Sequence, residues 1–281
     1  MRSRTFLISF AFLLQITASF VTPANGQEAT VPVQTSSDYE YQLGAVLYMQ
    51  KAAEYRALTY QAFNLARRQL DEDLDKKNLK KLPKAERNRP RAVVVDVDET
   101  VLDNSGYQVL MIKDRKSFGS KEWYAYTDMR KSRAVPGAVD FVKYANSMGV
   151  KVFYISNRDE TPQLQATIDN LRSVGFPNVS AENVLMRNKI SAKEPRRQLI
   201  GQKYRIVLLI GDSLDDISET FEQKSIAERF TALEQIRNEI GRRFIMLPNA
   251  MYGTWEKAIY EYGRLTEQQK AQKRVEALEL P

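Results

Sequence analysis

The sequence AVVVDVDET at residues 92–100 decides the fold prediction. Four apolar residues lead directly into acidic ones, a pattern typical of a buried strand that ends at the edge of a sheet. Similar apolar runs recur along the chain, separated by segments of helical periodicity. This alternation predicts an α/β fold, a doubly wound parallel sheet with helices on both faces. The later strands are expected at 150–155, 184–186, 206–210 and 244–247, and the helices near 136–148, 161–174, 192–201 and 216–240.

Two segments outside this alternation add helices to the core. Residues 38–75 carry apolar side chains at three- and four-residue steps, which predicts helices that pack on the rest of the protein. Residues 104–133 are rich in aromatic side chains and interrupt the alternation, so we expect an insertion after the first strand. The expected architecture is therefore an α/β core with an inserted and N-terminal helical cap.

The composition excludes several kinds of catalyst. The 281 residues include no histidine and no cysteine, which removes an imidazole base, a thiolate nucleophile, disulfides and metal sites built on these side chains. Phosphohistidine enzymes, vanadate-type acid phosphatases, zinc alkaline phosphatases and cysteine-based tyrosine phosphatases are excluded for the same reason. A catalyst in this chain must use carboxylates, lysines, hydroxyl groups or an oxygen-bound metal ion.

The first 26 residues have the pattern of a secretory signal peptide. Arg2 and Arg4 precede an apolar stretch from Phe6 to about Leu14, and small residues flank position 25. Cleavage before residue 27 would leave 40 Lys and Arg against 35 Asp and Glu, a net charge of +5. An N-terminal membrane anchor is the alternative, but the apolar run is shorter than the ~20 residues that a span needs. We therefore expect a periplasmic or secreted protein without a stable membrane anchor.

The remaining chain divides into three parts. Residues 27–91 combine the N-terminal helical segment with a basic stretch, 76–91, that reads as a solvated linker. A nucleic-acid patch is the alternative for this stretch, but it has no aromatic residue to stack on bases, and a modest positive charge is a weak argument for nucleic acid as a partner. Residues 92–263 form the core, and residues 264–281 form a polar tail that is expected to be a solvated helix.

Polar side chains follow three of the predicted strands at the edge where ligands of open parallel sheets bind. Asp96 and Asp98 follow the first strand, residues 156–158 follow the second, and Asp212 and Asp216 follow the fourth. Four carboxylates at one edge repel one another unless a cation lies between them, and ligands that are all oxygen favour Mg²⁺. The sequence thus predicts a magnesium site among these aspartates.

The spacing of Asp96 and Asp98 suits phosphoryl transfer. Asp96 can attack phosphorus in line to form an aspartyl-phosphate, while Asp98 can protonate the leaving oxygen and then activate the hydrolytic water. The phosphate oxygens also need donors, and the candidates are the Ser156 hydroxyl, the backbone N–H groups near Asn157 and a lysine.

Two lysines are candidates for this last role. Residues 191–194 read SAKE and fit a capping box, which would put Lys193 in the first turn of a helix at the same sheet edge. Lys189 is the competitor, and either side chain could instead be an ordinary surface lysine.

Five motifs together resemble the class C acid phosphatases, secreted or outer-membrane bacterial enzymes of the haloacid dehalogenase superfamily that include lipoprotein-type 5′-nucleotidases. The motifs are DVDETVLDNS at 96–105, SNR at 156–158, SAK at 191–193, GDSLDD at 211–216 and LPNAMYGTW at 247–255. The resemblance runs from about Tyr41 to about Trp255. It covers nearly all of the chain after the predicted signal peptide.

The resemblance implies a haloacid dehalogenase-like core and an Mg²⁺-dependent acid phosphatase whose expected substrates are nucleoside 5′-monophosphates. It implies that Asp96 is the nucleophile and Asp98 the general acid and base, and that Ser156 and Lys193 bind the phosphate. The implied Mg²⁺ ligands are Asp96, the carbonyl group of Asp98, and Asp212, with Asp216 in support.

The resemblance also implies an aromatic clamp for the substrate base, formed by Phe118, Trp123 and Tyr252. The alternative for each ring is a place in the core, because large aromatic residues are usually buried. Two departures from the family stand out: many relatives carry a lipid on an N-terminal cysteine that this chain lacks, and Ser213 stands where asparagine is usual. Relatives pair as dimers, so a homodimer is expected by analogy.

Two other functions fit parts of the sequence. A non-catalytic storage or binding protein on the same scaffold would have lost the nucleophile, whereas Asp96 is present. A nucleic-acid-binding module centred on residues 76–91 would show binding in a gel shift at low salt.

Overall fold

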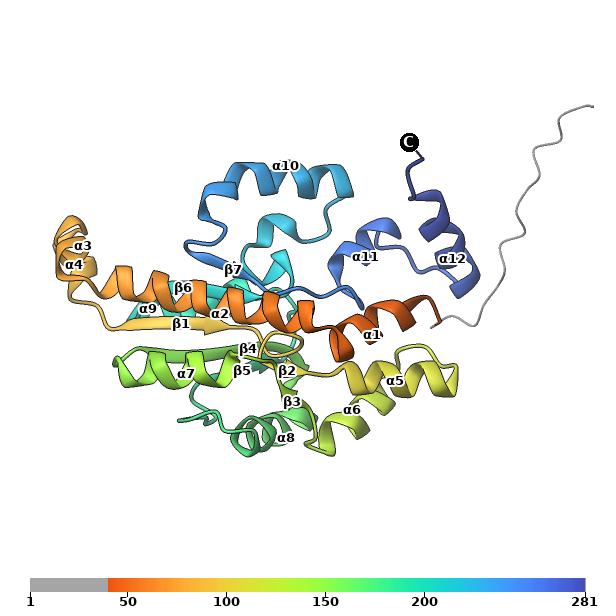
Figure 1. Cartoon of the computed structure of the whole chain (residues 1–281), viewed down its shortest axis with the longest axis horizontal. Helices are drawn as coiled ribbons and strands as arrows, with labels where there is room; N and C mark the ends of the chain where they lie inside the picture. Colours follow the sequence, from red (N-terminus) through yellow and green to blue (C-terminus); the bar gives the residue numbers. More distant parts are fainter. Residues whose placement is uncertain (1–39, 281) are drawn as a thin grey trace, which may run out of the picture. The chain divides into compact units, whose positions relative to one another are not determined.

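The computed structural model describes residues 40–280, and the predicted signal peptide lies outside this range. A five-stranded sheet forms its centre, and every pairing between neighbouring strands is parallel (Figure 1). In spatial order the strands are β5 (Val184–Arg187), β4 (Lys151–Asp159), β1 (Arg91–Val95), β6 (Arg205–Gly211) and β7 (Phe244–Met246). The predicted α/β fold with a parallel sheet is confirmed.

Helices cover both faces of this sheet because successive side chains of β1 point to opposite sides. Val93 and Val95 join the main core with buried residues of α2 (Ala53–Leu74), α7 (Ala138–Ser147) and α8 (Glu160–Ser173). Ala92 and Val94 lie in a second core with Ile200 of α9 (Glu194–Lys203). The apolar run at residues 92–95 is thus buried from both sides.

The N-terminal helical segment consists of η1 (Glu40–Gln42), α1 (Leu43–Lys51) and α2. The two α-helices are separate because Ala52 takes an extended conformation, with ψ of 130°. The stretch expected to be a linker contains two short helices, α3 (Lys76–Lys81) and α4 (Lys84–Arg87), and neither has a buried residue. The Asp75 side chain caps α3 by accepting hydrogen bonds from two backbone N–H groups.

The insertion after β1 is closed at its base by a two-stranded antiparallel sheet. In it, β2 (Leu102–Asp103) pairs with β3 (Arg133–Ala134). Between these strands lie α5 (Ser105–Asp114) and α6 (Ser120–Asp128). Their aromatic side chains form a small core of their own, which includes Tyr107 and Tyr126.

The segment 216–240, expected to be helical throughout, is broken into shorter pieces. They are η2 (Leu214–Asp216), η3 (Glu219–Phe221), α10 (Ile226–Ile236) and η4 (Arg237–Glu239). The first two of the three breaks arise because Ser218 and Ser225 act as N-caps, each accepting a bond from a backbone N–H ahead of it. The chain then continues into α11 (Thr254–Ile259) and α12 (Glu267–Glu276). Within residues 40–280, none of the helices has the length and apolar character required to cross a membrane.

Candidate active site

Three carboxylates meet where β1 and β6 end. Asp96 directly follows β1, Asp212 directly follows β6, and Asp216 ends η2. One oxygen from each lies within 4.8 Å of the others. Gly211 permits this approach, because a Cβ atom there would lie 2.5 Å from the Cβ of Asp216. The acidic cluster expected from the strand ends therefore forms from Asp96, Asp212 and Asp216.

Lys193 lies among these carboxylates. Its ammonium group donates a hydrogen bond to Asp96 and lies 2.7 Å from Asp216 Oδ1, and the residue is only 6% exposed. Lys189, the competing candidate, is exposed. The structure thus brings Lys193, and not Lys189, to the acidic cluster.

The capping box expected at residues 191–194 is wrong. Lys193 is itself the N-cap of α9, and no side chain caps the helix. The Glu194 carboxylate accepts hydrogen bonds from Arg197 and Gln198, so it does not turn back toward Ser191. Pro195 in the first turn favours a helix start at this point, because it has no N–H group to satisfy.

Burial of like charges shifts the titration of this cluster. Burial, followed by the Asp216, Asp212 and Asp98 carboxylates, raises the pKa of Asp96 well above its usual range, against the opposing effect of Lys193. Burial and the neighbouring Asp216 raise the pKa of Asp212 to about 7. Burial alone would lower the pKa of Lys193, but Asp216 and Asp96 outweigh it and raise that pKa. The cluster holds more negative charge than one lysine neutralises.

This donor set fits a hard divalent cation. All three side chains offer carboxylate oxygens, the ligands preferred by Mg²⁺, and their oxygens are close enough to share one ion. A bound cation would also relieve the repulsion that raises the pKa of Asp212.

The Asp98 carboxylate lies outside this three-carboxylate group and is held by three donors from two segments, β4 and the start of the insertion. Arg158 Nε donates to Asp98 Oδ1 at 2.9 Å, and Asn104 Nδ2 donates to the same oxygen at 2.8 Å. The Ser156 hydroxyl donates to Oδ2 at 3.0 Å. Arg158 and Asn104 had no role in the sequence-based prediction, although both lie in motifs that were recognised.

The two remaining phosphate candidates lie at the end of β4. Ser156 is fully buried, and its hydroxyl also accepts a hydrogen bond from the backbone N–H of Arg158. Asn157 is exposed, and its side-chain oxygen accepts a bond from Arg196 at 2.7 Å. Arg196 also donates to the carbonyl group of Ser156 at 2.7 Å, so one arginine of α9 holds both residues in place.

Asp212 is oriented by two residues that the sequence analysis did not single out. Thr100 donates to Asp212 Oδ1 at 3.1 Å, and Asn249 donates to Oδ2 at 2.8 Å. Ser213, the departure from the family pattern, forms a capping box with Asp216 and a hydrogen bond with Thr254. A small hydroxyl residue at this position therefore fits the local structure.

The three aromatic candidates lie in two clusters. Phe118 and Trp123 are neighbours in the insertion, with ring centroids 6.4 Å apart, and Phe118 is 63% exposed. Trp123 faces the Arg158 guanidinium at 5.3 Å, which connects the insertion to Asp98. Tyr252 packs with α1 and Met251 and donates a hydrogen bond to the buried carboxylate of Glu99.

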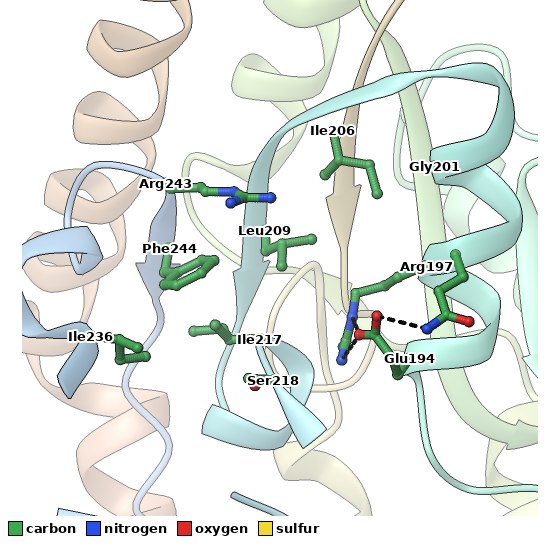
Figure 2. Close-up of a pocket in the computed structure, with 11 residues that line it drawn as sticks. Glu194, Arg197, Gly201, Ile206, Leu209, Ile217, Ser218, Ile236, Arg243 and Phe244 are labelled. Atoms are coloured by element: carbon green, nitrogen blue, oxygen red, sulfur yellow. Dashed lines mark hydrogen bonds and ion pairs between the residues drawn. The ribbon is translucent and has the colours of Figure 1, made fainter. Parts of the chain in front are cut away.

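The structure also contains a cavity of about 330 Å³ between α9, β6 and β7. Its walls include Arg197, Ile217 and Phe244, as Figure 2 shows, and no predicted site residue within 40–280 lines it. Arg197 links it to the acidic cluster, since its Nη1 donates to the carbonyl group of Asp216 at 2.7 Å. The cavity and the acidic cluster thus share one connecting side chain, Arg197.

Comparisons with known proteins give one consistent result. Residues 14–255 match the family model for the haloacid dehalogenase superfamily, subfamily IIIB (acid phosphatase). The chain is 37% identical to the class C acid phosphatase from Bacillus anthracis, with a TM-score of 0.80 over 87% of this chain and 99% of that one. The structure of that enzyme with tungstate bound gives a TM-score of 0.79 at the same identity and coverage.

Proposed function

The chain belongs to the acid phosphatases of haloacid dehalogenase subfamily IIIB, and from this we propose that it is an Mg²⁺-dependent phosphatase of nucleoside 5′-monophosphates. Enzymes of this family are phosphomonoesterases. The observation that carries the proposal is the position of Asp96, which ends the central strand next to Asp212, Asp216 and Lys193. The same residue argues against a non-catalytic protein on this scaffold.

In the proposed mechanism, an Asp96 oxygen attacks the phosphorus of the substrate and the bond to the ester oxygen breaks. Asp98 gives a proton to that leaving oxygen, and the phosphoryl group is now an acyl phosphate on Asp96. Asp98 then accepts a proton from water, whose oxygen attacks phosphorus and releases inorganic phosphate and free Asp96. The bonds from Arg158 and Asn104 support a fixed orientation of Asp98 for these two transfers.

The phosphate would be held by groups at the same edge. Lys193 provides the positive charge, while Ser156 and the backbone near Asn157 provide further donors. Asp96, Asp212 and the Asp98 carbonyl group would hold Mg²⁺, with Asp216 in support. The bound ion would neutralise charge on the transferring phosphoryl group. Tungstate bound to the related enzyme from Bacillus anthracis is in line with an oxyanion site in this family.

The preference for nucleotides rests on the aromatic residues. Phe118 is largely exposed beside Trp123, a disposition that suits stacking on a base. Tyr252 would contribute the opposite wall of the clamp. We also propose a periplasmic or secreted location, from the sequence of residues 1–26, and a homodimer by analogy with relatives.

The test is phosphate release from p-nitrophenyl phosphate and a panel of nucleotides, with Mg²⁺ or with a chelator. Wild-type protein should release phosphate only with the metal, and Asp96→Asn should be inactive. A matched control is Asp140→Asn, at an exposed position on α7, which should retain activity. Activity that survives Asp96→Asn would contradict the proposed mechanism.

A further inference from the structure

The C-terminal helix α12 is fixed to the protein by Arg274. The sequence predicted a solvated polar helix, and α12 lies beyond residues 14–255 that the family model matches. Its Arg274 guanidinium nevertheless stacks on the Tyr41 ring, with its central carbon 3.7 Å from the ring centroid. Nη1 of the same guanidinium donates to the Tyr260 hydroxyl at 2.6 Å. One side chain therefore connects α12 to both η1 and the end of α11.

These two tyrosines share a buried carboxylate. Tyr41 donates to Glu256 Oε1 at 2.5 Å, and Tyr260 donates to the same oxygen at 2.7 Å. Glu256 is only 8% exposed, so its charge needs these donors and the nearby cation. Arg274 thus supplies the positive charge of a network in which Glu256 is the centre.

The network extends to the segment that carries Tyr252. The Gln42 amide lies 3.2 Å from the Tyr41 hydroxyl and donates to the carbonyl group of Met251 at 2.8 Å. Met251 is fully buried and directly precedes Tyr252. From the other side, the Trp255 indole donates to the Tyr252 carbonyl at 3.2 Å. The backbone before Tyr252 is therefore connected to the Arg274 network through Gln42, and the Tyr252 carbonyl is held by Trp255, which directly precedes Glu256 in the chain.

The same helix also touches the insertion. Ser117 donates to Glu267 at the start of α12, at 3.5 Å, and the next residue is Phe118. Glu267 is fixed in turn by Lys270, at 2.6 Å. One helix thus contacts the segment that carries Phe118 directly and is connected to the Tyr252 segment through Tyr41 and Gln42, and these are the two sides of the proposed aromatic clamp.

We propose that α12 is a specificity element and that Arg274 is its positioning residue. Arg274 acts through Tyr41, Glu256 and Tyr260 to position the Tyr252 segment. The position of this segment then decides how well an aromatic group of the substrate binds. Arg274 itself does not touch the substrate or the acidic cluster. The inference rests on the proposed function, since it assumes that Tyr252 contacts a base.

The experiment compares kcat and KM for adenosine 5′-monophosphate and for glycerol 2-phosphate, which has no ring. Arg274→Ala in the full chain should raise KM for the nucleotide by about tenfold, because small misplacements of binding groups have large effects. The KM for glycerol 2-phosphate and both kcat values should stay unchanged. Arg274→Lys keeps the charge but loses the planar stack. Its KM for the nucleotide should therefore lie between the values of wild type and Arg274→Ala.

Lys273→Ala is the matched control, because it removes a charge from the same helix and breaks only a contact with Glu261, which is 76% exposed. If Arg274→Ala fails to fold, Tyr41→Phe removes only the hydroxyl on Glu256 and should give the same selective change. Equal effects on both substrates, or none, would overturn the inference while leaving the nucleotide phosphatase intact. A wild-type enzyme with no preference for the nucleotide would overturn the aromatic clamp and the inference together.

Discussion

Arg158 and Asp98 form a partly buried ion pair beside the candidate nucleophile. Arg158 Nη2 lies 2.8 Å from Asp98 Oδ1, and the arginine is 2% exposed. Its Nη1 donates to Thr167 and its Nη2 also donates to Asn104, so the guanidinium has a single orientation in the core. The carboxylate that must move two protons in the proposed reaction is therefore fixed by a residue that does not take part in it.

Replacement of Arg158 should impair turnover more than substrate binding. Arg158→Lys keeps a buried positive charge but cannot make the same set of bonds, so Asp98 loses its fixed orientation. We expect kcat for p-nitrophenyl phosphate to fall by about 10²-fold, the lower end of what a general acid contributes, with a small change in KM. Arg172→Lys is the control, since within residues 40–280 the Arg172 guanidinium donates only to the backbone carbonyl group of Val179. An unchanged kcat in Arg158→Lys would show that Asp98 needs no such support.

Divalent metal should stabilise the protein through the acidic cluster. Because Asp96, Asp212 and Asp216 repel one another, Mg²⁺ should raise Tm, and a chelator should lower it. Asp212→Asn removes one of the repelling charges, so it should raise Tm in the absence of metal and abolish most of the gain from Mg²⁺. Scanning calorimetry with and without metal checks both effects, and Asp140→Asn should respond as wild type does. A full response to Mg²⁺ in Asp212→Asn would place the metal elsewhere.

Local patterns explain why much of this arrangement could be predicted from the sequence. The run before Asp96 is apolar on both faces of the strand, as a central strand requires, so its end and the acids after it could be located. Parallel pairing then brings Asp96 and Asp212 together, because β1 and β6 are neighbours. Lys193 was expected at the site because a helix was predicted to start near it. The helix does start there, although the predicted capping box does not form.

The parts that escaped prediction depend on contacts between distant segments. Thr100 and Asn249 meet at Asp212 from positions 149 residues apart in the chain, and nothing local in either sequence marks that contact. Arg274 lies in a helix of polar residues, where the sequence pattern is the same for a solvated helix and for one fixed by a single stacked arginine. Side-chain partners of this kind are set by tertiary packing, which periodicity does not report.

Tyr252 offers two variants with different expected effects. Tyr252→Ala removes the ring, and stacking contributes on the order of 1–3 kcal/mol per base, so kcat/KM should fall much more for nucleotides than for glycerol 2-phosphate. Tyr252→Phe keeps the ring but leaves Glu99 Oε2 without its tyrosine donor, while Oε1 still accepts from the backbone N–H of Asn104, so it should lower stability by about 1–3 kcal/mol while nucleotide selectivity is largely retained. A panel of kcat/KM values and urea unfolding separates the two effects. Equal loss for all substrates in Tyr252→Ala would remove Tyr252 from the clamp.

Asp73 should make the stability of the fold depend on pH. Near the end of α2 it pairs with Arg205 at 2.6 Å and with Arg91 at 2.8 Å, where β6 and β1 begin. Burial alone would raise the pKa of Asp73, but hydrogen bonds from Arg205 and Arg91 outweigh it and hold that pKa below its usual value. In the unfolded chain the Asp73 carboxyl group has a pKa of ~3.9. The stabilisation by its ion pairs is therefore complete above about pH 4 and is lost as the pH falls through the lower pKa of the folded state.

Asp73→Asn should therefore lower the free energy of unfolding at pH 7 by about 2 kcal/mol, since two arginines lose a charged partner. The difference from wild type should shrink as the pH falls below about 4, because the wild-type carboxyl group becomes neutral as well. Urea unfolding across this range measures both. Glu72→Gln on the same helix is the control: its partner Arg68 is 77% exposed, and surface pairs contribute little. A difference between Asp73→Asn and wild type that is constant with pH would mean that Asp73 acts through its shape and not through its charge.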